Sequence, residues 1–531
     1  MPSVCVKNLD LSNNFYHNLD KREFSSCLSH LCQVCPRGSK PKCKGIFRKK
    51  EFIHWAHVAL ISKSFINDSK GKEFYDGDKY NKLRRSYDLF YGELIFCLDR
   101  VLKNSLEVTK KGNNINLENN LFKDDFNKIS SEKPDIVGFS VFSESQLYYS
   151  LALAKILKTR INTKIVFGGA CISHLEKRTI LQIFDFIDFI IYKEGEEGII
   201  GLLKNLEKGS FEEVPNLVYR KNGRVIENKD SAIRNLDQIP LPDFSDYNLK
   251  KYFAPQPVLS TLFSRGCFWG ACTFCAHHKT YSNPYRTRSI PNLILELEQY
   301  QKRGIRHIWF TDEIISAANL DSINKALLKK KINIYYGVML RPTGDFTYAI
   351  LKRMYKAGCR LIIWGVESFG QRIINLMNKG TNVQEIGDVL KNSHQVGLSS
   401  LIYMIRGFPT QAEEEILKDI EILREKSKFF YRVSMHNFWL EEGTHIFRNP
   451  KKFELKYLKR KPLLKIKGLK LFSPNLVFIN KNKIDWKRLR RLLERSQKKD
   501  KCLNEFNDTG IFYSKEHILL HLSRKKKKVR N

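Results

Sequence analysis

Three cysteines lie close together near the middle of the chain, in Ser264-Arg-Gly-Cys-Phe-Trp-Gly-Ala-Cys-Thr-Phe-Cys275. Thiolates are the usual protein ligands of iron–sulfur clusters and are common ligands of zinc. Three thiolates can hold three irons of a cubane and leave the fourth iron open to a small molecule that chelates it. The alternative is a structural zinc site, in which His277 or His278 would supply the fourth ligand.

A second group of cysteines lies near the start of the sequence. Its spacing is ligand-like, so we expect a zinc site or an auxiliary iron–sulfur cluster formed by Cys27, Cys32, Cys35 and Cys43. His30 is a candidate further ligand, and the alternative is a set of loop thiols that bind no metal. Clustered thiols favour metal or redox chemistry over a disulfide framework.

Strands alternate with helices between residues 131 and 250, which predicts a doubly wound parallel sheet. The expected strands are Asp135–Phe142, Lys164–Gly169 and Ile187–Tyr192, with a helix over Leu147–Thr159. Ligands of such sheets bind at the carboxyl ends of the strands. The candidate binding residues at those ends are Ser140, Gly168, Gly169, Glu194 and Glu196.

Six further strand–helix units between residues 251 and 455 predict a partial (βα)6 barrel. The strands are expected at Val258–Ser264, His307–Thr311, Ile332–Leu340, Leu361–Val366, Leu401–Ile405 and Val433–Trp439. One helix should begin at a Ser289 cap and end at Gly304. Functional residues of barrels gather at the carboxyl ends of strands. Here those ends carry Cys267, Asp312, Glu313, Arg341, Glu367, Ser368 and Arg406.

The cysteine segment resembles that of radical S-adenosylmethionine (SAM) enzymes, and the resemblance extends to about residue 425. Lys356–Ser368, Met377–Thr381 and Arg406–Thr410 are similar to later segments of that family. The resemblance implies that Cys267, Cys272 and Cys275 hold a [4Fe–4S] cluster. It also implies that SAM is held by Phe274, Asp312, Glu313, Arg341, Glu367 and Ser368. Two departures are visible: the spacing is C-x4-C-x2-C rather than C-x3-C-x2-C, and Thr311-Asp312-Glu313 stands where Gly-Gly-Glu is usual.

Residues 134–243 resemble the cobalamin-binding domain that precedes the radical SAM barrel in one subfamily, although the D-x-H-x-x-G motif is absent. The resemblance assigns the strand-end residues Ser140, Gly168, Gly169, Glu194 and Glu196 to cobalamin. Val6–Tyr16 resembles the second strand of that domain, so we expect its first strand to be missing. Either the sequence starts late or the domain is degenerate.

The resulting hypothesis is an enzyme that cleaves SAM reductively to a 5′-deoxyadenosyl radical and modifies an unactivated carbon. With cobalamin, the reaction would be C-methylation of a peptide or natural product; without it, a cyclisation or rearrangement. Tyr87–Phe96 is similar to a segment of enzymes that modify ribosomally made peptides. The sequence identifies no catalytic residue. An electron donor such as a flavodoxin or ferredoxin is the expected partner.

The net charge of the chain also suggests an alternative from a different class of protein. A net charge of +36 suits an acidic partner, but basic residues are scattered over every segment, which is also what a general lysine bias produces. The charge and the two cysteine groups together suggest one alternative from another class, a zinc-dependent nucleic-acid-binding protein. Under the main hypothesis, nucleic acid is not an expected partner. A methylthiotransferase is a weaker alternative, because its cysteine pattern and RNA-binding domain are not evident.

The expected location is the cytoplasm, because there is no signal-peptide pattern and no apolar run of about 18–20 residues that could span a membrane. The expected domains are an N-terminal region (1–130), the cobalamin-like domain with its linker (131–250), the barrel (251–455) and a small basic C-terminal extension (456–531).

Overall fold

The computed structural model describes residues 74–75, 80, 98–100, 102–107, 122–252, 254–281, 284–456, 458–482, 484–489, 491 and 515–524. The first cysteine group and the segments Val6–Tyr16 and Tyr87–Phe96 lie outside these residues, so their assignments stay predictions. Among the helices described, none has the length and apolar character needed to cross a membrane.

The chain divides into two compact units. The first contains residues 1–233, 243–256 and 462–473, and the second contains residues 234–242, 257–461 and 474–531. The domain borders expected from the sequence remain a prediction. Each unit is described by itself below.

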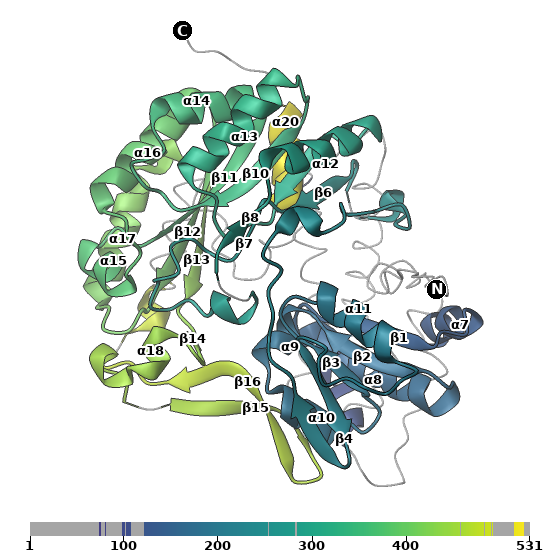
Figure 1. Cartoon of the computed structure of the whole chain (residues 1–531). Coiled ribbons are helices and arrows are strands. Elements are labelled where there is room, and N and C mark those ends of the chain that lie inside the picture. The colour runs from purple at the N-terminus through teal and green to yellow at the C-terminus, as the bar shows by residue number, and fades with distance from the viewer. Residues whose placement is uncertain are drawn as a thin grey trace, which may run out of the picture. The chain divides into compact units, whose positions relative to one another are not determined.

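The first unit is built on a five-stranded sheet with the order β1-β2-β3-β4-β5. Strands β1 (Ile136–Ser140), β2 (Lys164–Gly168) and β3 (Phe189–Ile191) are parallel. The chain crosses between them through α8 (Glu144–Arg160), α9 (Ala170–His174) and α10 (Lys177–Ile183), and α11 (Glu196–Asn205) follows β3 (Figure 1). The parallel α/β sheet expected from the sequence is confirmed.

The last two strands of this sheet were not predicted. Strands β4 (Leu217–Lys221) and β5 (Arg224–Glu227) form an antiparallel hairpin, and β4 pairs antiparallel with β3. Asn222 and Gly223 connect them with φ angles of +50° and +73°. Two positive φ angles at an Asn-Gly pair are the mark of a tight two-residue hairpin turn. The sheet is therefore mixed, with a parallel part and an antiparallel edge.

The second unit is built on six parallel strands in the order β13-β12-β11-β10-β9-β6, which confirms the partial barrel. The strands are β6 (Val258–Thr261), β9 (His307–Phe310), β10 (Tyr335–Leu340), β11 (Cys359–Glu367), β12 (Ser399–Arg406) and β13 (Arg432–Asn437). The alternating helices are α12 (Ile290–Lys302), α13 (Ala317–Lys329), α14 (Tyr348–Lys356), α16 (Val383–Val396) and α17 (Glu413–Glu425). Figure 1 shows α13, α14 and α16 along the outside of the sheet.

Local signals fix where these helices start. The Ser289 side chain accepts a hydrogen bond from the Asn292 amide, with a proline in the first helical turn, as expected for α12. Ser316 and Thr347 cap α13 and α14 in the same way. The chain after α12 turns at Gly304, whose φ is +77°. The capping residues of α12, α13 and α14 therefore fix where the loop before each of these helices ends.

A helix from the end of the sequence packs against the sheet face opposite to α14. Helix α20 (Lys515–Arg524) buries Ile518, Leu519 and Leu522 in one cluster with Trp309, Leu361, Ile363 and Leu401. Ile363 and Trp364 are neighbours on β11, so their side chains point to opposite faces of the sheet. The Trp364 ring contacts Phe346, which lies just before α14. Ser523 Oγ and His307 Nε2 lie 3.0 Å apart, and burial lowers the pKa of His307 to about 4. The C-terminal helix thus covers part of the inner face of the barrel.

A small sheet with the order β14-β16-β15 follows the barrel. Its strands are β14 (Leu440–Glu441), β15 (Leu458–Ile466) and β16 (Leu469–Phe478), and β14 pairs antiparallel with β16. Leu463, Leu464, Ile466 and Leu471, near the tip of the β15–β16 hairpin, pack in the core of the first unit. This hairpin was not predicted either.

Candidate functional site

The three central cysteines lie on a loop that follows the first barrel strand. Strand β7 (Ser264–Arg265) pairs antiparallel with β8 (Arg286–Thr287) and closes the loop at its base. Within it, Gly266 and Gly270 have φ angles of +83° and +61°, which other residues rarely adopt. The Gly270 amide donates to Cys267 Sγ at 3.5 Å. We call residues 266–275 the cysteine loop.

Asp312 anchors the chain that enters the cysteine loop. It follows β9 and is fully buried, and its carboxylate accepts hydrogen bonds from the Phe263 amide (3.0 Å), the Ser264 amide (2.6 Å) and the Ser264 hydroxyl (2.6 Å). Burial raises the pKa of Asp312 to about 6, and the hydrogen bonds act in the opposite direction. In the structure this carboxylate positions the loop, so a direct contact with SAM stays a prediction.

A second anchor ties the loop to the end of α15 (Gln371–Met377). Trp269 Nε1 donates to the Asn378 carbonyl at 2.8 Å, and Asn378 Nδ2 donates to the Ala271 carbonyl at 2.9 Å. The Thr273 amide and hydroxyl donate to the carbonyls of Met377 and Leu376, both at 2.9 Å. The loop between the first two cysteines is therefore fixed to a segment more than 100 positions later in the sequence.

Arg341, at the end of β10, packs on the aromatic side chains of the loop. Its guanidinium carbon lies 4.2 Å from the Trp269 ring centroid and 5.6 Å from that of Phe268. A Cβ added to Gly380 would lie 2.3 Å from the Trp269 indole, so only glycine fits there. Arg341 also donates to the Lys379 carbonyl at 3.1 Å. These contacts bring the expected site residue Arg341 to the cysteine loop.

Glu367, at the end of β11, forms a buried ion pair with Lys379. Glu367 Oε1 and Lys379 Nζ are 2.8 Å apart, and about a tenth of each side chain is exposed. Glu367 has a φ of +67°, at an irregularity in the pairing of β11 with β12. A positive φ in a non-glycine residue is a strained conformation that the surroundings must hold. Glu367 was expected from the sequence but Lys379 was not, although both lie in segments that carry the family resemblance.

Ser368 is placed differently from its neighbour. Its hydroxyl donates to the Asp419 carboxylate on α17 at 2.9 Å, and Asp419 also accepts from the Phe369 amide at 2.7 Å. Burial raises the pKa of Asp419 to about 6. These bonds give Ser368 a role in shaping the turn after β11, while a contact with SAM stays a prediction.

Two other expected residues lie beside the loop. Glu313 Oε1 is 3.0 Å from His277 Nε2, and burial together with the nearby Asp312 raises the pKa of Glu313 to about 7. The Phe274 ring meets the ring of Phe408 edge-on at 6.5 Å and packs against the buried cluster that contains Phe408. The structure thus places Asp312, Glu313, Arg341 and Glu367 at the carboxyl ends of neighbouring strands, and Phe274 on the cysteine loop.

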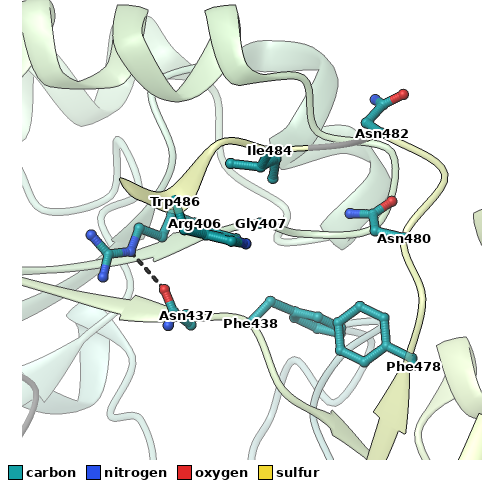
Figure 2. Close-up of a pocket in the computed structure, with 9 residues that line it drawn as sticks. All are labelled: Arg406, Gly407, Asn437, Phe438, Phe478, Asn480, Asn482, Ile484 and Trp486. Atoms are coloured by element: carbon teal, nitrogen blue, oxygen red, sulfur yellow. Dashed lines mark hydrogen bonds between the residues drawn. The ribbon is translucent and has the colours of Figure 1, made fainter. Parts of the chain in front are cut away.

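The remaining strand-end residue, Arg406, lines a separate pocket of about 230 Å³ (Figure 2). Arg406 Nε donates to Asn437 Oδ1 at 2.7 Å, and its guanidinium carbon lies 5.7 Å from the Trp486 ring centroid. The pocket is lined by Arg406, Gly407, Asn437, Phe438, Phe478, Asn480, Asn482, Ile484 and Trp486. Asn480 and Asn482 use their side chains to hold the chain at Phe408–Thr410.

In the first unit, packing explains the glycines selected from the sequence. A Cβ on Gly169, whose φ is +95°, would lie 2.6 Å from the Val141 carbonyl oxygen, and one on Gly168 would lie 3.0 Å from that of Ile191. Ser140 is exposed at the end of β1, whereas Glu194 is buried and its carbonyl accepts from Asn216 at 2.6 Å. Glu196 begins α11. The assignment of these residues to cobalamin stays a prediction.

The side chains of the cysteine loop fit an iron–sulfur cubane. The donor set is three thiols on one anchored loop, with an N–H···S hydrogen bond at Cys267 and a buried ammonium nearby. Hydrogen bonds to sulfur and local charge are features by which proteins stabilise such clusters. Among the described residues, no three His, Cys, Asp or Glu side chains converge on a single ion. In a cubane each thiolate binds a different iron.

The sequence is similar to a known protein family and to other known proteins. The sequence profile of the family described as the radical SAM superfamily matches residues 261–423. The chain is 29% identical over 310 residues to an uncharacterized methyltransferase of Pyrococcus horikoshii, covering 57% of this chain and 67% of the relative. It is 27% identical over 289 residues to the hopanoid C-3 methylase of Methylococcus capsulatus, covering 52% and 54%. The chain therefore spans about half the length of this second relative.

Two solved structures have a similar fold. One is the radical SAM methyltransferase TsrM from Kitasatospora setae, with cobalamin and a [4Fe–4S] cluster bound: TM-score 0.54, 15% identity, and coverage of 61% of this chain and 68% of TsrM. The other is the cobalamin-dependent SAM radical enzyme OxsB with aqua-cobalamin bound: TM-score 0.56, 18% identity, and coverage of 71% and 60%. At these identities the likeness shows the fold.

Proposed function

We propose that this chain, whose residues 261–423 match the radical SAM superfamily, is a radical SAM enzyme that methylates an unactivated carbon. The observation that carries the proposal is the cysteine loop, closed at its base by β7 and β8 and anchored by Asp312 and Asn378 at the carboxyl end of the barrel. The methylases and methyltransferases among its relatives support the reaction class.

The side chains of the site have separate tasks in this proposal. Cys267, Cys272 and Cys275 would hold the cluster, which when bound supplies one electron for reductive cleavage of each SAM molecule. Asp312 and Asn378 keep the loop in one conformation, so that the thiolates need no rearrangement to bind. We assign Phe274 and Glu367, which lie beside the cysteine loop, to the binding of SAM. The reaction also needs a reductant, for which we propose a flavodoxin or ferredoxin, and a peptide or small-molecule substrate.

Anaerobic reconstitution with iron and sulfide tests the cluster and SAM cleavage. We expect about four irons per chain, and 5′-deoxyadenosine after addition of dithionite and SAM. Cys272→Ala should lose both. The matched control is Cys171→Ala, which removes a buried thiol of the first unit and should retain both. Zinc without iron in the wild-type protein, and no 5′-deoxyadenosine, would refute the radical SAM function and favour the zinc-binding alternative.

We further propose that the first unit binds cobalamin. Its sheet presents Ser140 and the nearby Phe142, which is 75% exposed, at the carboxyl end of β1. An exposed aromatic side chain at this edge offers an apolar surface to a flat ligand, and such edges are where α/β sheets bind ligands. The cobalamin named in the titles of the TsrM and OxsB structures supports the same assignment.

Cobalt content after incubation with hydroxocobalamin and gel filtration tests this second proposal. We expect about one cobalt per chain in the wild-type protein. Ser140→Trp should reduce binding by obstructing the carboxyl edge. The control Lys164→Trp changes an exposed residue at the opposite, amino end of β2 and should bind normally. A protein that makes 5′-deoxyadenosine but retains no cobalt would instead be a cobalamin-independent cyclase or rearrangement enzyme.

A further inference from the structure

A lysine that sequence analysis did not select lies beside the cysteine loop. Lys379 follows the C-terminal end of α15, and its side chain is 11% exposed. Its Nζ donates to Glu367 Oε1 at 2.8 Å and lies 5.9 Å from the centroid of the Phe274 ring. Phe274 directly precedes Cys275 and lies one residue after Thr273, which follows Cys272. The ammonium group therefore lies next to the part of the loop that carries two of the three thiols.

The space that the ion pair occupies is created by Gly365. A Cβ at this position of β11 would lie 2.9 Å from Lys379 Nζ and 2.8 Å from Glu367 Oε1. A Cβ atom does not approach other atoms this closely, so a larger residue would displace the charged ends of these two flexible side chains. The barrel strand is thus adapted to hold a charged lysine at this point.

The position of Lys379 relative to the thiols is fixed by the backbone. Its neighbour Asn378 exchanges two hydrogen bonds with the cysteine loop, one to Trp269 and one to Ala271. The Lys379 carbonyl accepts from Arg341, which itself packs on Trp269. Movement of the ammonium away from the loop would require these contacts to break.

The charges around Lys379 keep it protonated. Burial alone would lower the pKa of Lys379, but the Glu367 carboxylate, 2.8 Å from its Nζ, opposes this effect, and the pKa is raised. A cation in a partly dry environment acts on neighbouring charges much more strongly than one in water.

We propose that Lys379 is a positioning residue for the iron–sulfur cluster, and that its ammonium raises the reduction potential of that cluster. The inference rests on the proposed function. Reduction adds one electron, taken from a low-potential one-electron donor, and therefore one negative charge to the cluster. A fixed buried cation favours the more negative state, although the paired Glu367 carboxylate offsets part of this effect. Local charge is one of the features that set the potentials of such clusters.

Redox titration of the reconstituted protein, followed by electron paramagnetic resonance of the reduced cluster, tests the inference without substrate. At a fixed applied potential, Lys379→Met should lower the ratio of reduced to oxidised cluster about tenfold, which is a shift of about 59 mV to lower potential for one electron. Lys379→Arg keeps the charge and should stay close to wild type. Lys391→Met removes an exposed lysine of α16 and serves as the matched control.

A second neutral variant, Lys379→Gln, keeps a hydrogen-bond donor for Glu367. It allows the same measurement if Lys379→Met does not fold. Unchanged potentials in both neutral variants, with full iron content, would overturn the inference and leave the proposed function intact. Loss of iron from both, with iron retained in Lys379→Arg, would show a purely structural role and would also overturn it. A wild-type protein that loads no iron would refute the proposed function itself.

Discussion

Asn378 allows the anchoring of the cysteine loop to be separated from the stability of the fold. It ends α15 in the left-handed region, with φ +50° and ψ +44°, and its side chain donates to the Ala271 carbonyl. Replacement by alanine removes the hydrogen bond and also places a Cβ in a strained conformation. Replacement by glycine removes the hydrogen bond but tolerates the conformation.

The magnitudes follow from these two contributions. A left-handed conformation costs a residue with a Cβ about 1–2 kcal/mol, although asparagine tolerates it better than alanine does. An exposed hydrogen bond contributes about 0.5–1 kcal/mol. We therefore expect Asn378→Ala to lower the free energy of unfolding of the second unit by about 2 kcal/mol, and Asn378→Gly by about 1 kcal/mol. Both should shorten the lifetime of the bound cluster equally, because both lose the same bond to the loop.

Two assays read these quantities separately. Urea unfolding followed by tryptophan fluorescence reports the second unit, because five of the six tryptophans lie within it. Iron release to a chelator under anaerobic conditions reports the loop. Equal urea midpoints for the two variants would refute the argument from left-handed strain. Iron release at the wild-type rate in both would refute the assignment of Asn378 as an anchor.

Three further predictions concern stability. Gly365→Ala should cost about 1 kcal/mol by displacing the ion pair at β11, whereas Gly138→Ala, which has no atom within 4 Å of the added Cβ, should have little effect on urea unfolding. The pKa of Asp419 is raised from 3.8 to about 6. The contribution of this carboxyl group to the free energy of unfolding is therefore fully present below pH 3.8 and is lost as the pH rises through 6. Over this range the urea midpoint should therefore fall more in the wild type than in Asp419→Asn, and parallel profiles would contradict this. Leu519→Ala should cost about 2–5 kcal/mol because this side chain of α20 is fully buried, and an unchanged midpoint would show that α20 does not pack on the barrel.

Local patterns in the sequence predicted the repeating parts of the fold. The apolar runs that became β9, β11 and β12 were recognised because buried parallel strands are nearly continuous in apolar residues. The hairpin of β4 and β5 was missed, although Asn222-Gly223 between two apolar runs is a strong hairpin signal. The sheet edge therefore could have been predicted from the sequence.

The site was predicted in its residue types but not in their orientations. Spacing alone selected Cys267, Cys272 and Cys275, because ligands of one loop are close in sequence. Whether Asp312 and Ser368 face a ligand or the backbone depends on partners such as Phe263 and Asp419, which are about 50 positions away. Lys379 was missed for the same reason, because its importance comes from a fold that brings it to the loop. No local pattern contains this information.

The position of α20 has a consequence for how the chain matures. The contact between His307 and Ser523 joins residues 216 positions apart, and long-range contacts form slowly because a large loop must close first. All six barrel strands leave the ribosome before residues 515–524 are made. In every shorter nascent chain, the apolar side chains Trp309, Leu361 and Leu401 lack the helix that covers them. Premature termination upstream of α20 should therefore yield aggregation-prone protein rather than a smaller working enzyme.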